Sequence, residues 1–384
     1  MESCACIYNA EGSFAASAEI LSRSCAWYLA SAASAAGFTR IFTVGALCED
    51  WEGAESLPIR EGASYFSALA EESSVLVFFE ALPALTAATV KLLAASECAL
   101  LSDDAHEPLA LHAPGSVVAK LSGKRETLVE ELTALGPIFT EVSLTEADGG
   151  PVTQGAQLYD CQEILRRRIN ARLMQRGAIL VDPSTAYISP EARVESGAVI
   201  LPGCMLNGKT HIEAMAKIGP NSVITDSVIG CGASVNNSQV VESTVGAQTT
   251  VGPYAYLRPG CDVGEKARIG TFIEMKKAKV GNGTKMAHLS YLGDIELGQR
   301  CNIGGGVIVV NYDGKKKHKT TVGDDCFIGC NVNLVSPVEI HNGAYVAAGS
   351  TITDEVPENA LSIARARQVN KADWAKKRRE KGVL

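Results

Sequence analysis

Residues 244–275 read TVGAQTTVGPYAYLRPGCDVGEKARIGTFIEM, and from Val245 to Met275 every sixth residue is aliphatic or methionine. The same six-residue period runs from Ile188 to Ile224 and again from Val322 to Ile352. A helix repeats every 3.6 residues and a half-buried strand every two, so neither explains this pattern. A period of six fits one flat face of a triangular coil of about 18 residues. We therefore predict a left-handed parallel β-helix of hexapeptide repeats over residues 179–365.

Glycine follows the repeated apolar residue in several turns, at positions 219, 252, 270, 304 and 329. We expect these corners to need a backbone freedom that a side chain would restrict. The period is lost over residues 311–319 and recovers at Val322, which predicts a loop projecting from the prism. The flat outer faces of such a prism favour packing against copies of itself, so we predict a homotrimer.

Charge divides the chain of 384 residues into two parts. Residues 1–150 hold 7 Lys and Arg against 21 Asp and Glu, whereas the remainder holds 28 against 22. The acidic part repels polyphosphates, and the mildly basic part suits a small anionic ligand but is far from a nucleic-acid footprint. We expect no nucleic-acid partner.

Hydropathy and cysteine usage favour a cytoplasmic protein. No stretch of about 18 apolar residues appears, and the first residues lack a basic segment followed by an apolar one, so we expect neither a membrane span nor a signal peptide. The twelve cysteines are scattered without a CxxC pair. We expect small buried hydrophobic side chains, with no disulfides and no structural zinc.

Residues 1–155 alternate helical and strand-like segments, which predicts an α/β layer domain. We expect helices over 18–36 and 84–95 and strands over 41–44 and 75–79. The stretch 9–13, NAEGS, has one glycine and an acid where a loop that cradles a nucleotide needs several glycines and a lysine.

Residues 156–178 form an amphipathic linking helix that ends at Gly177, and residues 366–384 form a basic tail. The run Arg166–Arg168 could bind an anion or be a solvated helix face. We favour the solvated face.

Four motifs carry a family resemblance: YLRPG at 256–260, FIEMKKA at 272–278, HLSYLGD at 288–294 and NYDG at 311–314. In this order and spacing the chain resembles the acetyltransferase half of the bifunctional N-acetylglucosamine-1-phosphate uridyltransferase / glucosamine-1-phosphate acetyltransferase family. The close match covers residues 251–365. The resemblance implies acetyl transfer from acetyl-CoA to the amine of glucosamine-1-phosphate, giving N-acetylglucosamine-1-phosphate for UDP-N-acetylglucosamine and peptidoglycan synthesis.

The resemblance also implies roles for single residues. His288 matches the general base, and an imidazole that titrates near 6.5 can accept the proton that an attacking amine must lose. The residues that match the sugar-phosphate site are Arg258, Lys276, Tyr291, Asn302 and Lys317. A guanidinium and lysines around one phosphate agree with this role. The residues that match the acetyl-CoA site are Gly305, Asn311, Tyr312, Cys330, Ala348 and Arg365.

Two of these positions depart from the family, which usually has Ala where Gly305 stands and Ser where Cys330 stands. If Gly305 presents its backbone N–H to the acyl oxygen, the loss of a methyl group leaves that donor intact. Glu274 could orient His288 or balance the lysines. The basic run Lys376–Arg379 could reach coenzyme A phosphates, although we favour a solvated tail. We expect no metal at this site and no need for Mg²⁺ in acetyl transfer.

The N-terminal part departs much further from the family. Residues 36–41 and 75–83 resemble two segments of its Rossmann-like nucleotidyltransferase domain, but Glu80-Ala81 stands where a Gly-Asp pair is expected. The glycine-rich loop is absent and the domain is shorter. We predict a degenerate domain whose uridyltransferase activity is lost, and the sequence leaves open whether it binds a nucleotide sugar, a partner or nothing.

Other interpretations remain. The acceptor could be another amino sugar or a sugar nucleotide. The chain could also be a non-catalytic trimeric scaffold, although a scaffold would not require His288, Tyr291, Asn302 and Asn311 together. A prism-type carbonic anhydrase needs three converging histidines, and His211, His288, His318 and His341 lack such spacing, so we rank it last.

Overall fold

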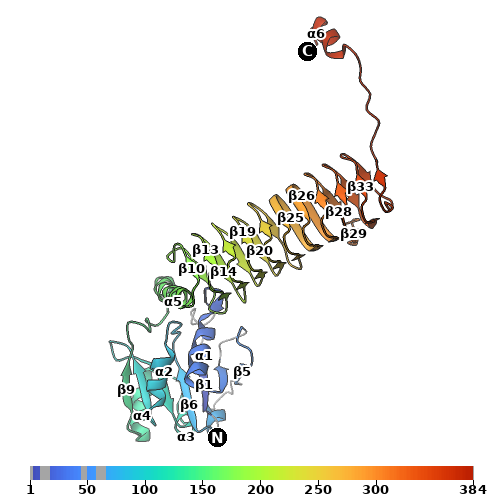
Figure 1. Cartoon of the computed structure of the whole chain (residues 1–384). Coiled ribbons are helices and arrows are strands. Elements are labelled where there is room, and N and C mark those ends of the chain that lie inside the picture. The colour runs from blue at the N-terminus through green and yellow to red at the C-terminus, as the bar shows by residue number, and fades with distance from the viewer. Residues whose placement is uncertain (1–2, 9–17, 45–49, 58–65, 384) are drawn as a thin grey trace. The chain divides into compact units, whose positions relative to one another are not determined.

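The computed structural model describes residues 3–8, 18–44, 50–57 and 66–383, so the glycine-poor stretch 9–13 lies outside the described residues. The chain divides into two compact units (Figure 1). The first comprises Met1–Ala192 with Met205–Thr210, and the second comprises Arg193–Cys204 with His211–Leu384.

The first unit is built on a seven-stranded sheet in the order β5-β4-β1-β6-β8-β7-β9. The central strand β1 (Ser3–Tyr8) pairs parallel with β4 (Arg40–Val44) and β6 (Ser74–Phe78), and β8 (Pro108–Ala113) pairs antiparallel with β6. The remaining elements of the sheet and its helices are β5 (Glu55–Ser56), β7 (Ala99–Ser102), β9 (Thr140–Ser143), α1 (Cys25–Ala36), α2 (Ala87–Ala94), α3 (Gly115–Val118) and α4 (Leu128–Leu135), with short 3₁₀ turns at Ser67–Leu69 and Arg125–Thr127.

Both faces of this sheet are covered, as an α/β layer domain requires. Along β6, Leu76 and Phe78 pack with α1 and α2, whereas Val75 and Val77 pack with the opposite cluster that contains Phe66. This alternation follows from the two-residue period of a strand. The predicted α/β class of the N-terminal part is therefore confirmed.

The predicted helix over 18–36 is wrong in its first seven residues. Residues Glu19–Ile20 (β2) and Arg23–Ser24 (β3) form a small antiparallel hairpin, and the helix starts only at Cys25. Ser24 explains the start, because its side-chain oxygen accepts a hydrogen bond from the backbone N–H of Trp27 at 3.0 Å. The second helix, predicted over 84–95, is α2, and its N-cap is Thr86.

The predicted linking helix is α5 (Gly155–Gln175), and Gly177 follows it with a positive φ of 95°. The expectation of a solvated arginine face is wrong for Arg166, whereas Arg167 and Arg168 are exposed. Arg166 is buried, pairs with Glu163 and donates to the carbonyl of Pro183. Arg168 donates to the carbonyls of Ala84 and Ala147, so these side chains hold α5 against the unit rather than facing only water.

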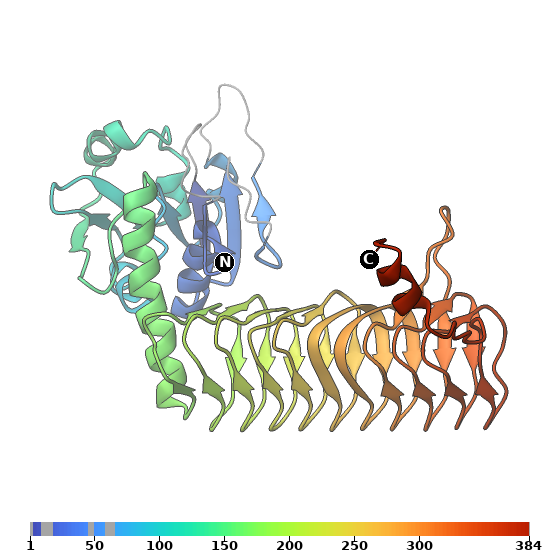
Figure 2. The same cartoon turned by 90° about the horizontal axis from the view of Figure 1, so that it is seen from above.

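The second unit is a stack of coils made of short parallel strands (Figure 2). Each strand pairs with the strand of the next coil, so one inward-facing column runs through Ile224, Val240, Leu257, Met275 and Leu292. The 19 in-phase positions predicted from the sequence are at most 6% exposed. The predicted parallel β-helix is therefore confirmed.

The strands of the prism are short, apart from β25 and β26. Their bounds are β10 (Ile179–Leu180), β11 (Tyr187–Ile188), β12 (Arg193–Val194), β13 (Val199–Ile200), β14 (Met205–Asn207), β15 (His211–Ile212), β16 (Lys217–Ile218), β17 (Val223–Thr225), β18 (Val228–Ile229), β19 (Ser234–Val235), β20 (Gln239–Val241), β21 (Thr244–Val245), β22 (Thr250–Val251), β23 (Tyr256–Leu257), β24 (Asp262–Val263), β25 (Arg268–Val280), β26 (Lys285–Leu297), β27 (Asn302–Ile303), β28 (Ile308–Val310), β29 (Thr320–Val322), β30 (Phe327–Ile328), β31 (Asn333–Val335), β32 (Val338–Ile340), β33 (Tyr345–Val346), β34 (Thr351–Ile352) and β35 (Leu361–Ser362), followed by α6 (Trp374–Glu380).

The length of a coil varies, which corrects the prediction of one uniform turn. Val199 pairs with Lys217, which lies three full hexapeptides further along the chain. In contrast, the pairing of Val223 with Gln239 and that of Arg268 with Lys285 each close a shorter coil. These shorter coils explain why the six-residue series that ends at Ile224 resumes out of step at Val245. The coil from Asn302 to Phe327 is longer than the others because it carries the projecting loop.

Only some of the corner glycines need the backbone freedom that the sequence analysis expects. Gly219 and Gly252 have φ of 122° and 95°, where a side chain is disfavoured. At Gly270 the constraint is instead contact with the next coil, since a Cβ there would lie 2.0 Å from the carbonyl oxygen of Ala287. Gly304 is similar, with a Cβ position 2.6 Å from the backbone nitrogen of Cys330. Parallel strands about 4.8 Å apart leave no room for that methyl group.

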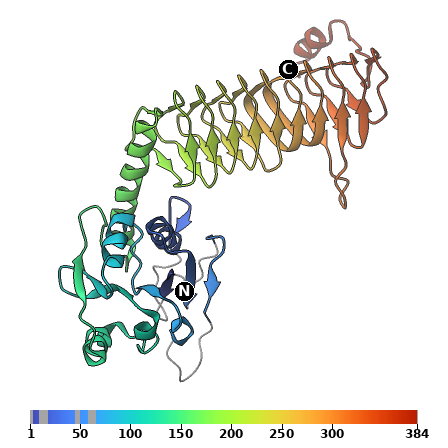
Figure 3. The ribbon, with the colours of Figure 1, turned by 60° about the horizontal axis from the view of Figure 1, so that its bottom comes forward.

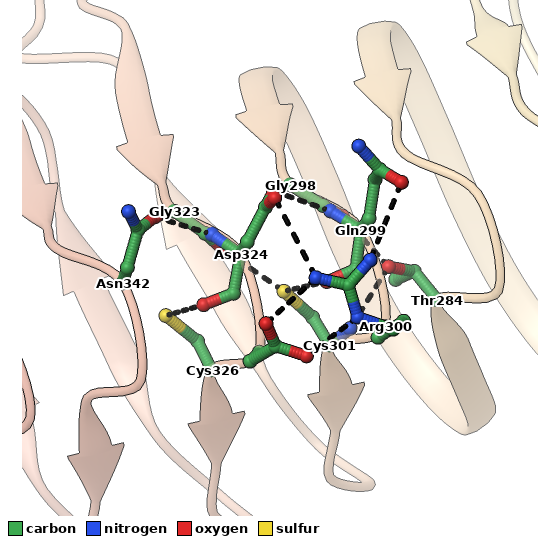
Figure 4. A network of polar contacts seen from close by, with 10 residues as sticks. Thr284, Gly298, Gln299, Arg300, Cys301, Gly323, Asp324, Cys326 and Asn342 are labelled. Carbon is green, nitrogen blue, oxygen red and sulfur yellow. Dashed lines mark hydrogen bonds and ion pairs between the residues drawn. The ribbon is translucent and has the colours of Figure 1, made fainter.

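Side chains join successive coils at another corner, shown in Figure 4. Asp324 accepts a hydrogen bond from the backbone N–H of Gln299 at 2.8 Å, and its own N–H donates to the Asn342 side chain at 2.8 Å. Beneath them Cys301 donates to the carbonyl of Gly323 at 3.0 Å. Eleven cysteines of the described residues carry free thiols, and nine of them are buried, which agrees with their expected role as small core side chains.

Candidate functional site

The predicted site residues fall mainly on two edges of the prism. The histidine edge is a column in which consecutive coils contribute His288, Gly305, Cys330 and Ala348. A Cβ on Gly305 would lie 3.4 Å from the Cβ of His288, and the backbone N–H of Gly349 donates to the carbonyl of Cys330 at 2.8 Å. Arg365 ends the column, since its Cδ lies 3.6 Å from the Cβ position of Gly349. The structure thus brings five of the predicted residues together along one edge.

His288 is exposed on β26 and its backbone is held firmly. The hydroxyl of Ser290 donates to the carbonyl of His288 at 3.1 Å, and the N–H of Val307 donates to that hydroxyl at 3.2 Å. The imidazole itself makes no hydrogen bond to the described residues of its own chain. Such a side chain is free to meet a substrate and accept a proton from it.

The lysine edge carries the cations at the next corner of the prism, starting two coils before that of His288. It comprises Arg258, Lys276 and Lys317. Lys317 above all, and then Arg258, lower the pKa of Lys276 because like charges nearby disfavour its protonated form. Arg258 also pairs with Glu274 at 2.9 Å between Nη1 and Oε1. Glu274 therefore balances Arg258 within the protomer, and the cluster as a whole suits a phosphate.

Tyr291 and Asn311 meet on the lysine edge around Gly293. A Cβ on Gly293 would lie 2.5 Å from the Tyr291 hydroxyl and 2.7 Å from the Asn311 amide nitrogen. The amide of Asn311, which is buried, donates to Asp294 at 2.6 Å. Gly293 and Asp294 belong to the motif HLSYLGD, but the sequence predicted no role for either residue. Only the structure shows that Asp294 accepts the hydrogen bond of the Asn311 amide and that Gly293 leaves room for it.

The projecting loop, residues 311–319, is a small hairpin seen in orange in Figures 2 and 3. Tyr312 and Lys317 form its antiparallel bridge. Asp313 organises the tip by accepting hydrogen bonds from the N–H groups of Lys316 and Lys315 at 2.6 and 2.7 Å. These donors and His318 hold the pKa of Asp313 far below its usual range. The loop thereby presents Lys317 beside Lys276.

Asn302 lies apart from both edges, on the adjoining face. It pairs in register between Lys285 and Phe327, and its side chain is exposed. Beside it the rings of Phe327 and Tyr345 stack at 4.4 Å between centroids. Within one protomer the structure does not bring Asn302 to the lysine edge.

The two edges are also separate within one protomer. Lys276 pairs in register with Gly293, which stands five residues after His288 in the same strand. Five extended residues span up to about 16 Å, so one face of the prism separates the two corners along the strand. The described residues contain no cluster of three or more His, Cys, Asp or Glu side chains that could hold a metal ion.

Comparison with known proteins first defines the class. The family model "Bacterial transferase hexapeptide (six repeats)" matches residues 319–354, which agrees with the hexapeptide repeats and the left-handed β-helix of the prism. None of the described helices combines the length and apolar character that crossing a bilayer requires.

The closer resemblance is to Bifunctional protein GlmU, and it confirms the family likeness expected from the motifs. The protein from Clostridium novyi is 49% identical over 65% of this chain and 55% of its own length. That from Clostridium acetobutylicum is 51% identical over 61% of this chain and 50% of its own length. The chain therefore spans about half the length of the curated relatives it matches.

Solved structures resemble the chain more distantly. Arabidopsis UDP-N-acetylglucosamine acyltransferase aligns with a TM-score of 0.30 and 15% identity, over 51% of this chain and 77% of that one. LpxA from Acinetobacter baumannii aligns with a TM-score of 0.25 and 18% identity, over 53% and 77%. The fold described above rests on strand pairing and repeats rather than on these alignments.

Proposed function

We propose that this protein transfers an acetyl group from acetyl-CoA to the amine of glucosamine-1-phosphate. The observation that carries the proposal is the lysine edge, where Arg258, Lys276 and Lys317 gather beside the Tyr291 hydroxyl, one corner away from the exposed His288. A cation cluster suits the phosphate of the acceptor, and an imidazole suits the deprotonation of its amine.

The chemistry of the reaction assigns each edge a task. The amine nitrogen attacks the thioester carbonyl and His288 takes its proton. The carbon–sulfur bond then breaks and the coenzyme A thiolate leaves, to be protonated. The lysine edge and Asn302 hold the sugar phosphate. Gly305, Asn311, Tyr312, Cys330, Ala348 and Arg365 are the proposed contacts of acetyl-CoA, which is a co-substrate.

A homotrimer explains how two separate edges can serve one reaction. A three-sided prism packed about a threefold axis places an edge of one protomer beside a different edge of the next. His288 of one copy would then face the sugar bound at the lysine edge of another. Asn302, on the adjoining face, would be supplied in the same way.

The N-terminal part is proposed to lack uridyltransferase activity. Glu80-Ala81, just after β6, stands where the family has a Gly-Asp pair whose Asp binds a metal ion. Glu80 is therefore the carboxylate that lies nearest to that position in the chain. Arg125 pairs with its carboxylate and also donates to the carbonyl of Pro108 at 2.7 Å. A carboxylate held by a guanidinium is a poor ligand for a divalent cation.

The test is coenzyme A thiol release from acetyl-CoA with glucosamine-1-phosphate, glucosamine, glucosamine-6-phosphate or a sugar-nucleotide amine as acceptor. We expect turnover on glucosamine-1-phosphate, and a drop of about 10²- to 10⁴-fold in His288→Ala. His211→Ala is the matched control, because His211 lies on the same prism and is bonded to Glu195 at 2.8 Å. Its turnover should stay unchanged.

Three results would contradict the proposal. Turnover only with a different amine would reassign the acceptor. If a folded protein released no thiol with any acceptor, it would not be an acetyl-CoA-dependent acetyltransferase. Pyrophosphate release from UTP with N-acetylglucosamine-1-phosphate and Mg²⁺ would show that the uridyltransferase activity survives.

A further inference from the structure

A cavity of about 380 Å³ opens on the surface of the first unit, where α1, α2 and α5 line a common space; the three helices can be followed in Figure 1. Its size falls in the range of small-molecule sites, about 300–1,000 Å³. All the residues proposed for acetyl transfer come from the second unit, so they leave this cavity without a role.

Two arginines of α5, Arg168 and Arg172, line the cavity. They are four residues apart, so they lie one above the other on the same helix face, and both are exposed. In the described part of the chain neither forms an ion pair, whereas neighbouring Arg166 pairs with Glu163. An anion between the two guanidinium groups would give both of them a counter-charge.

Both guanidinium groups are held in place by backbone carbonyls. Nη2 of Arg168 donates to Ala84 at 2.8 Å and to Ala147 at 2.6 Å, and Nη2 of Arg172 donates to Pro190 at 3.1 Å. Their Nε and Nη1 groups have no acceptor among the described residues. A fixed guanidinium with unused N–H groups is a donor that can bind two oxygens of a phosphate.

The rest of the cavity is mainly apolar. Trp27 of α1 and Leu165 and Ile169 of α5 form part of the wall. The protein around the arginines also desolvates them, which lowers the pKa of both groups. An inorganic anion alone would leave the apolar wall unused, so the ligand should carry an organic part as well.

We propose that this cavity binds a small organic phosphate, with the phosphate between Arg168 and Arg172 and an apolar or aromatic part against Trp27, Leu165 and Ile169. The site is separate from the proposed acetyl-transfer site. It gives the degenerate domain a binding role that does not depend on a nucleotidyltransferase centre.

The test uses the full chain with phenyl phosphate, uridine 5′-monophosphate, uridine and inorganic phosphate, followed by calorimetry and tryptophan fluorescence. We expect the two organic phosphates to bind, uridine not to bind and inorganic phosphate to bind more weakly. Arg172→Gln should weaken binding by about tenfold or more, because it removes a charged donor. Arg167→Gln is the matched control on the same helix, since Arg167 is exposed and does not line the cavity.

Circular dichroism and unchanged acetyl transfer show whether Arg172→Gln is folded. Equal affinity in Arg172→Gln and the wild type overturns the proposal, and so does an equal loss in the Arg167→Gln control. Failure of both organic phosphates to bind at millimolar concentration also overturns it. Inorganic phosphate binding as tightly as phenyl phosphate overturns the role of the apolar wall.

Discussion

At the scale of single residues, adjacent glycines have opposite tolerance for a side chain. A Cβ on Gly304 would lie 2.6 Å from the nitrogen of Cys330, whereas a Cβ on Gly305 meets nothing nearer than 3.4 Å. We predict that Gly304→Ala lowers the free energy of unfolding by about 1–3 kcal/mol, since the coils must separate to admit the methyl group. Gly305→Ala should change it by less than about 0.5 kcal/mol and keep activity. Denaturant unfolding of both variants tests this, and equal stability of the two would refute the steric account.

At the scale of elements, the projecting loop controls the charge of β25. Lys317 is the main cause of the lowered pKa of Lys276, so Lys317→Ala should raise that pKa toward its ordinary value of about 10.4. A bound phosphate favours protonated Lys276, so acceptor affinity should be highest below this pKa and fall as pH rises through it. In Lys317→Ala that fall should start at higher pH.

NMR titration of the lysine Nζ groups measures the shift directly. Lys279→Ala is the control on the same strand, because Lys279 pairs with Glu296 at 3.5 Å and does not act on Lys276. If Lys276 titrates at the same pH with and without Lys317, the loop does not approach β25 in solution.

At the scale of the whole molecule, the separation of the two edges predicts sites shared between protomers. The chain of 40.4 kDa should sediment as a trimer of about 120 kDa. His288→Ala and Lys276→Ala should each be inactive alone, and a co-expressed equal mixture should recover about a quarter of wild-type activity. This fraction follows from random assembly, because each site needs an intact histidine from one copy and an intact lysine from its neighbour.

Mixing the two variants after separate purification, without exchange of subunits, is the control and should recover nothing. A co-expressed mixture that is also inactive would mean that one protomer supplies both edges, and the shared-site proposal would fail.

The sequence by itself determined the prism, because burial of one aliphatic side chain in every face imposes a period that survives in the residue order, as at Ile224 and Leu257. It also predicted the projecting loop, and four short motifs pointed to Arg258, Lys276, His288 and Tyr291 of the two edges. The sequence did not predict the lengths of single coils. A face of five residues buries its core side chain just as fully as a face of six does, as between Ile224 and Ile229.

Only the tertiary structure decided which residues meet. It separated His288 from Lys276 on two edges, joined Tyr291 to Asn311 over Gly293, and placed the exposed Arg168 and Arg172 at the mouth of one cavity. Such contacts depend on the register between coils and on the packing of α5 against α1. The register and the helix packing are both determined by residues far apart in the chain, so a local period in the sequence cannot predict them.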